Sequence, residues 1–100
     1  MKNELKDKLE LSWDYDEGFF GQLRQGKFVP ELYQEFITLL REISFDDEEL
    51  IEKDIVSYLW YIPSFMSWQS ERVSSSISLE EYNLKRTEVE NELERILGIP

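Results

Sequence analysis

Apolar residues in this chain recur three and four positions apart over four long segments, and this spacing constrains the fold more than any other feature. It places side chains on one face of a helix. In residues 30–43 these positions are Leu32, Tyr33, Phe36, Ile37, Leu39, Leu40 and Ile43. No segment of useful length alternates apolar and polar residues, and no β-hairpin turn signal is present. The pattern predicts an all-α fold, a compact bundle of five or six helices in a single acidic domain, residues 1–100.

Residues that begin and end helices divide the chain into its expected elements. We expect helices at about residues 5–13, 16–26, 30–43, 46–62, 63–73 and 78–97, with a serine linker at 74–76. The predicted starts are Asp16 as an N-cap, Pro30 in a first turn, and capping boxes at Asp46 with Glu49 and at Ser78 with Glu81. The predicted stops are Gly26, Pro63 and Gly98.

The charge of the chain is strongly negative, with 22 acidic and 11 basic residues and a net charge of −11. Residues 11–50 hold ten acidic and three basic residues, so the acidity is concentrated there. Such a field disfavours nucleic acid and anionic membranes and attracts basic partners, although it also serves solubility. No signal peptide opens the chain, and its longest uncharged run, residues 55–70, is too short and polar to span a bilayer. We therefore expect a cytoplasmic protein.

Most catalytic chemistries have no residues to support them. The chain has no cysteine and no histidine, which excludes disulfides, thiolate nucleophiles, Cys/His zinc sites and histidine-based triads. Residues 21–27 match a P-loop, but Phe28 replaces the magnesium-binding hydroxyl and no strand precedes them. Residues 14–18 begin like a calcium loop, but Phe19 and Gln25 replace its turn glycine and bidentate glutamate. We expect no cofactor, no metal and no enzymatic activity.

Two features remain as candidates for partner binding. Acidic residues lie beside aromatic ones at 14–17 and again at 46–52, whereas those at 88–94 are expected to form a solvated helix face. The segment 60–68 holds two tryptophans, a tyrosine and a phenylalanine, which cannot all face inward from one kinked helix. At least one of these side chains should reach the surface, where Trp and Tyr are favoured interface anchors.

Three strings of the sequence resemble an immunity family of bacterial polymorphic-toxin and contact-dependent inhibition systems. They are Ser12-Trp13-Asp14, Gly18-Phe19-Phe20-Gly21-Gln22-Leu23-Arg24-Gln25-Gly26-Lys27-Phe28 and Leu59-Trp60-Tyr61-Ile62-Pro63. They cover about a quarter of the chain. The acidic immunity proteins of colicin nucleases are a looser comparison, and since their paired-tyrosine motif is not found here, none of their residues is carried over.

The resemblance implies a protein that binds a cognate toxin domain, a basic nuclease, and covers its active site or an exosite. A free monomer is expected. The candidate partner-binding residues are Asp14, Tyr15, Asp16, Glu17, Asp46, Asp47, Glu48, Glu49, Glu52, Tyr61 and Trp68. Two alternatives stay open: an acidic adaptor that docks on a basic or helical protein, and a small homo-oligomeric structural subunit.

Overall fold

The computed structural model describes residues 2–46 and 48–99, and within these ranges all regular secondary structure is helical. The six helices are α1 (Lys2–Ser12), α2 (Phe19–Arg24), α3 (Pro30–Glu42), α4 (Lys53–Trp60), α5 (Ile62–Trp68) and α6 (Leu79–Leu97). The prediction of an all-α bundle of five or six helices is confirmed.

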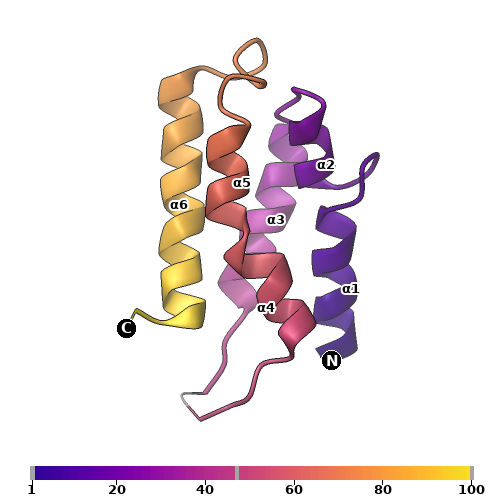
Figure 1. Ribbon diagram of the computed structural model, residues 1–100, viewed down its shortest axis with the longest axis vertical. Coiled ribbons are helices and arrows are strands. Elements are labelled where there is room, and N and C mark those ends of the chain that lie inside the picture. The colour runs from indigo at the N-terminus through magenta and orange to yellow at the C-terminus, as the bar shows by residue number, and fades with distance from the viewer. Residues whose placement is uncertain (1, 47, 100) are drawn as a thin grey trace.

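The helices lie roughly along the long axis of the molecule (Figure 1). In this view α1 and α6 form the two sides, α4 and α5 follow one another in front, and α3 lies behind them. α1 packs against α4, and α6 packs against both α3 and α5. The radius of gyration is 13.4 Å, close to the value of about 13 Å for a compact chain of this length.

Several of the predicted boundaries are confirmed. Pro30 is the first residue of α3, where its missing N–H costs no hydrogen bond. The Ser78 hydroxyl accepts a hydrogen bond from the Glu81 backbone N–H at 3.2 Å and so caps α6. α4 ends at Trp60, and Pro63 lies in the first turn of α5. Gly26 and Gly98, with φ of 81° and 86°, follow the ends of α2 and α6.

Asp16 was expected to be the N-cap of the second helix, and this prediction is wrong. The N-cap of α2 is Gly18, with no side-chain hydrogen bond. Asp14 stabilises the segment before the helix, because its carboxylate accepts hydrogen bonds from the backbone N–H groups of Asp16 (3.1 Å) and Glu17 (2.9 Å). The acidic segment 14–17 is therefore an Asx-type turn that precedes the helix.

The predicted helix start at Asp46 and Glu49 is also wrong, since α4 begins at Lys53. One hydrogen bond of a capping box is present, because the Glu49 carboxylate accepts from the Asp46 backbone N–H at 3.2 Å. No helix follows it, and Leu50 is 90% exposed. Most helix stability comes from burying an apolar face against the rest of the protein. The exposed Leu50 side chain contributes to no such buried face.

Aromatic side chains fill much of the core. The Phe20 ring is fully buried and lies 4.8 Å from Phe36 and 5.7 Å from Phe65, measured between ring centroids. Trp13 stacks on Phe20 at 4.4 Å. Leu79, the first residue of α6, points outward and is 61% exposed.

The end of the fifth helix and the serine segment after it differ from expectation. α5 ends at Trp68 rather than near residue 73, and residues 69–77 form turns. The serine segment 74–76 is tied to the core, because the Ser76 hydroxyl accepts from the Phe28 backbone N–H at 2.9 Å. Buried Val73 and Ile77 flank it.

None of the helices in the described part of the chain combines the length and the apolar character that crossing a membrane requires.

Candidate protein-binding surface

The acidic turn, defined as residues 14–17, is fully exposed and is held by the helix that follows it. The Gln25 side-chain amide donates to the Tyr15 carbonyl at 2.7 Å, and the Gln22 amide donates to the Asp16 carbonyl. Together with the Asp14 carboxylate, these bonds fix the turn at the start of α2. Neither glutamine was among the candidate residues predicted from the sequence. Gln22 and Gln25 are three residues apart and so lie on the same face of a helix, which was the sequence signal for a shared role.

The second acidic group lies elsewhere. Asp46, Glu48, Glu49 and Glu52 belong to the loop between α3 and α4, and Asp47 lies outside the described residues. Figure 1 shows this loop at the end of the molecule where both chain termini lie, whereas the acidic turn is at the far end of α1.

Contacts between α1 and α4 explain this separation. The Lys6 ammonium lies 2.9 Å from the Asp54 carboxylate, and the Trp13 indole N–H donates to the Tyr58 carbonyl at 3.2 Å. The two helices are thus parallel, so the acidic turn lies beside the end of α4 and the loop 43–52 precedes its start. An eight-residue helix is about 12 Å long, and the structure does not bring the two acidic groups together.

Three aromatic side chains form an exposed cluster on α4 and α5, here called the aromatic surface: Trp60, Tyr61 and Trp68. The Tyr61 ring lies 5.5 Å from Trp60 and 5.7 Å from Trp68, between centroids. Trp60 is 59% exposed and Trp68 is 64% exposed. The expectation that this segment cannot be wholly buried is confirmed. Trp60 was not among the candidates, although its place beside Tyr61 at the helix break was a usable signal.

The aromatic surface is anchored in the core and is linked through Trp13 to the acidic turn. Tyr61 is half-buried, and its ring lies 6.1 Å from Trp13 and 6.3 Å from the buried Phe65. The Arg24 guanidinium lies 5.0 Å from the Phe65 ring centroid, over its face. Trp13 directly precedes Asp14, so the residue whose ring supports Tyr61 is also the residue before the acidic turn.

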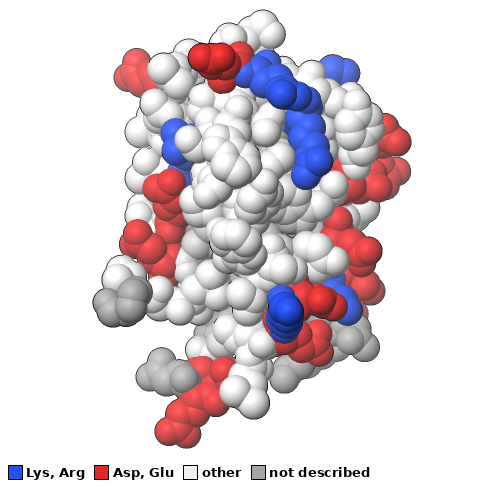
Figure 2. Space-filling view, in the orientation of Figure 1, with Lys and Arg blue, Asp and Glu red and all other residues white. Residues whose placement is uncertain are grey.

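Figure 2 shows the charge around this face. The middle of the face formed by α4 and α5 is largely free of charged side chains. Acidic side chains gather along both of its edges, and basic ones gather near the end where α2 lies. An uncharged centre with a charged rim is the usual anatomy of a protein interface.

The acids at 88–94 are not simply a solvated face, as had been expected. The Tyr33 hydroxyl donates to the Glu88 carboxylate at 2.7 Å, and burial together with this bond raises the pKa of Tyr33. Glu92 pairs with Arg95 at 2.9 Å, and the Arg95 guanidinium donates to the Leu40 carbonyl at 2.8 Å at the end of α3. Glu88 therefore joins α6 to α3 directly, whereas Glu92 pairs with Arg95, the residue of α6 that reaches the end of α3.

The other groups whose pKa is shifted also belong to contacts between helices. A hydrogen bond with Asp54 raises the pKa of Lys6, and the same bond lowers the pKa of the Asp54 carboxyl. Burial raises the pKa of Tyr82 to about 12, and its hydroxyl donates to the Met66 carbonyl at 2.7 Å.

Across residues 2–46 and 48–99, no three His, Cys, Asp or Glu side chains converge in a way that could hold a metal ion. Comparison of the chain with family models, with curated proteins and with solved structures found no match.

Proposed function

We propose that this chain is an immunity protein, a non-catalytic cytoplasmic inhibitor that binds a cognate bacterial toxin domain, a basic nuclease, and covers its active site or an exosite. The observation that carries the proposal is the aromatic surface, where two exposed tryptophans flank a half-buried tyrosine beside the acidic turn.

Exposed tryptophans of this kind support a binding role because large apolar rings are costly to leave in water. Trp and Tyr are enriched among residues whose truncation weakens interfaces by about 2 kcal/mol or more. Tyr61 is braced by Trp13 and Phe65, so little side-chain freedom is lost when a partner covers it.

The charge of the chain supports the choice of partner. A nuclease must present a basic groove to its substrate, and a protein of net charge −11 complements such a groove. The acidic turn is linked through Trp13 to the aromatic surface, and it would steer the encounter while the rings slow release. The resemblance of residues 12–14, 18–28 and 59–63 to an immunity family points to the same class.

The experiment begins with the protein encoded directly upstream of this chain, which should contain the toxin domain if the proposal is right. Binding is measured by surface plasmon resonance, and growth protection by co-expression of the two proteins. Trp68→Ala should raise the dissociation rate about thirtyfold, as expected of a side chain worth about 2 kcal/mol. Asp16→Lys should lower the association rate and flatten its dependence on salt, while leaving Asp14 to hold the turn.

Matched charge reversals separate this surface from general attraction. Glu94→Lys on α6 makes the same change in net charge at a distant, exposed position, and Asp46→Lys in the loop 43–52 tests the second group of candidate binding residues, which lies away from the acidic turn. Both should leave the association rate within about twofold of the parent. Equal losses for all three reversals would contradict docking beside the acidic turn.

The oligomeric state tests the structural alternative. Sedimentation should give a monomer near 12.1 kDa. A stable dimer that Trp68→Ala dissociates would overturn the proposal in favour of a homo-oligomeric subunit. Failure of the chain to bind or to protect against the upstream protein would instead favour an adaptor.

A further inference from the structure

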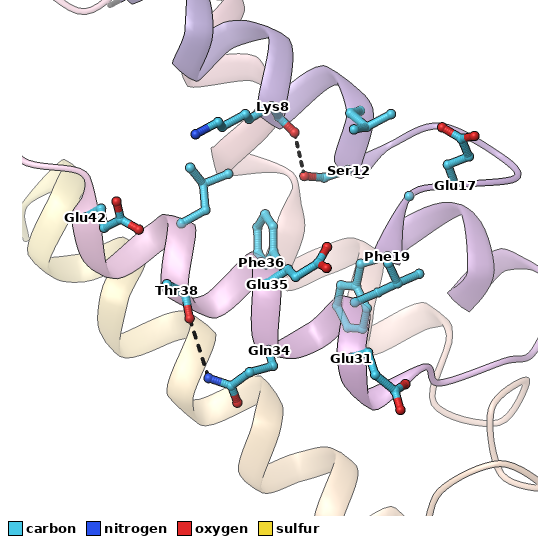
Figure 3. A pocket seen from close by; sticks show the side chains of 14 residues that line it. Lys8, Ser12, Glu17, Phe19, Glu31, Gln34, Glu35, Phe36, Thr38 and Glu42 are labelled. Carbon is cyan, nitrogen blue, oxygen red and sulfur yellow. Dashed lines mark hydrogen bonds between the residues drawn. The ribbon is translucent and has the colours of Figure 1, made fainter.

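A groove of about 690 Å³ lies between α1 and α3. It is lined by α1, by the acidic turn's last residue, by the start of α2 and by α3, and none of its lining residues comes from α4, α5 or α6. The groove is therefore separate from the aromatic surface. Figure 3 shows Lys8 and Ser12 of α1 on one side of it and the side chains of α3 on the other.

The floor of the groove is apolar. Phe19 and Phe36 lie at its base and are almost fully buried, and Leu32 and Leu39 of α3 are half-buried beside them. Leu11 of α1 faces them from the opposite wall and is 52% exposed. An apolar floor with an exposed leucine leaves apolar surface in water that a partner could cover.

The rim of the groove is acidic. Glu31, Glu35 and Glu42 follow α3 at spacings of four and seven residues, and thus form a row along one side of the helix. Glu17 adds a fourth carboxylate from the acidic turn, and the basic side chain among the lining residues is Lys8. Four carboxylates against one ammonium give the lining a net charge of −3.

We propose that this groove binds an amphipathic α-helix of a partner protein, whose apolar stripe is flanked by lysine or arginine. The row from Glu31 to Glu42 spans eleven residues, or about 16 Å, which matches three turns of a bound helix. Leu32, Phe36 and Leu39 fall at i, i+4 and i+7, the spacing at which a docked helix presents its own anchors. Basic residues beside those anchors would meet the glutamate row.

Charge favours this occupant over a second copy of the chain. Two copies would each bring a net charge of −11 to an interface already lined by carboxylates. Like charges across an interface are strongly unfavourable. The proposal does not depend on the immunity function, because the groove shares only Glu17 with the surface proposed for the toxin and can be tested without a toxin.

The test uses a fluorescein-labelled helical peptide of about 15 residues, with leucine at i, i+4, i+7 and i+11 and lysine at the flanking positions. Binding to the full chain is followed by fluorescence anisotropy at about 50 and about 200 mM salt. Amide chemical shifts in NMR spectra locate the bound peptide. We expect binding that weakens with salt, and shifts confined to α1, the acidic turn, the start of α2 and α3.

Two pairs of charge reversals provide the matched comparison. Glu31→Lys with Glu35→Lys should weaken peptide binding about tenfold, whereas Glu90→Lys with Glu94→Lys on α6 should change it less than about threefold. Leu11→Ser should weaken peptide binding about three- to fivefold, because it removes apolar surface from the α1 wall of the groove. All of these side chains except Glu90 are exposed and Glu90 is half-buried, and circular dichroism checks that each variant is folded.

Four outcomes would overturn the proposal. They are the absence of binding, equal binding of a peptide with the same composition and scrambled leucines, equal losses for both pairs of reversals, and shifts on α4 and α5. A dimer in sedimentation whose interface maps to α1 and α3 would assign the groove to a second copy and would also overturn it.

Discussion

Gly21→Ala offers a sharp test of how α2 holds the acidic turn. Gly21 lies inside α2 and is buried, and its Cα faces the backbone of the turn. A Cβ atom there would overlap the Asp14 carbonyl oxygen and would lie 2.6 Å from both the Cα and the carbonyl oxygen of Tyr15. Ordinary carbon contacts are at about 3.5 Å or more. Since the obstacle is backbone, the turn must retract from α2.

The change in the free energy of unfolding follows from three contributions, of which the first is stabilising and the other two are destabilising. Alanine is favoured over glycine inside a helix by about 1 kcal/mol. Overpacking of this kind costs about 1–3 kcal/mol. Retraction of the turn also loses the two hydrogen bonds from Gln22 and Gln25, at about 1 kcal/mol each. We therefore expect Gly21→Ala to lower the free energy of unfolding by about 2–4 kcal/mol.

Urea denaturation followed by circular dichroism measures this change, and NMR spectra show whether the amide shifts of residues 13–17 move. Ser64→Ala in α5 is the control, because it introduces the same residue at an exposed helical position. It should stabilise the chain by no more than about 0.5 kcal/mol. If Gly21→Ala were as stable as the parent, the close approach of α2 to the turn would be refuted.

Three further experiments test the core, the helix caps and the response to alkali. Leu59 is fully buried, so Leu59→Ala should lower the free energy of unfolding by about 2–5 kcal/mol. In the same urea assay, Leu50→Ala should change it by less than about 0.5 kcal/mol, and a larger loss would contradict its exposure. Ser78→Ala should cost about 1 kcal/mol through the lost cap, whereas Asp46→Ala should cost much less, because no helix begins at Asp46. Burial raises the pKa of Tyr82 to about 12, above the value near 10 of an unfolded chain. Stability should therefore fall as the pH rises from about 10 to 12, and Tyr82→Phe should make that fall shallower in urea titrations at each pH.

The parts of the fold that could be predicted are those decided by neighbouring residues. Pro30, Pro63 and the pair of Ser78 and Glu81 act through φ restriction or through bonds within one turn, and each lies where the sequence indicates. Asp46 and Glu49 have the same local signal, and their pairing also forms, but no helix follows it. A capping signal predicts a local hydrogen bond, whereas a helix also needs a surface against which to pack.

The candidate site shows the same division. The sequence alone indicated that the aromatic segment 60–68 could not be fully buried, because one kinked helix has too narrow an inner face for it. It did not determine which rings are exposed, because that depends on how α5 rotates against α6 and on the Trp13 ring that α1 places beside Tyr61.

Composition and helical spacing thus determined that this chain is acidic, all-α and rich in core aromatics, because those properties depend on residue type and on positions a few residues apart. Only the tertiary structure decided which charges share a surface. The parallel packing of α1 and α4 separates the acids at 14–17 from those at 46–52. The approach of α1 to α3 gathers four glutamates around an apolar groove. Such neighbours lie far apart in the chain, as Lys6 and Asp54 do, and the packing of helices, which no local pattern encodes, brings them together.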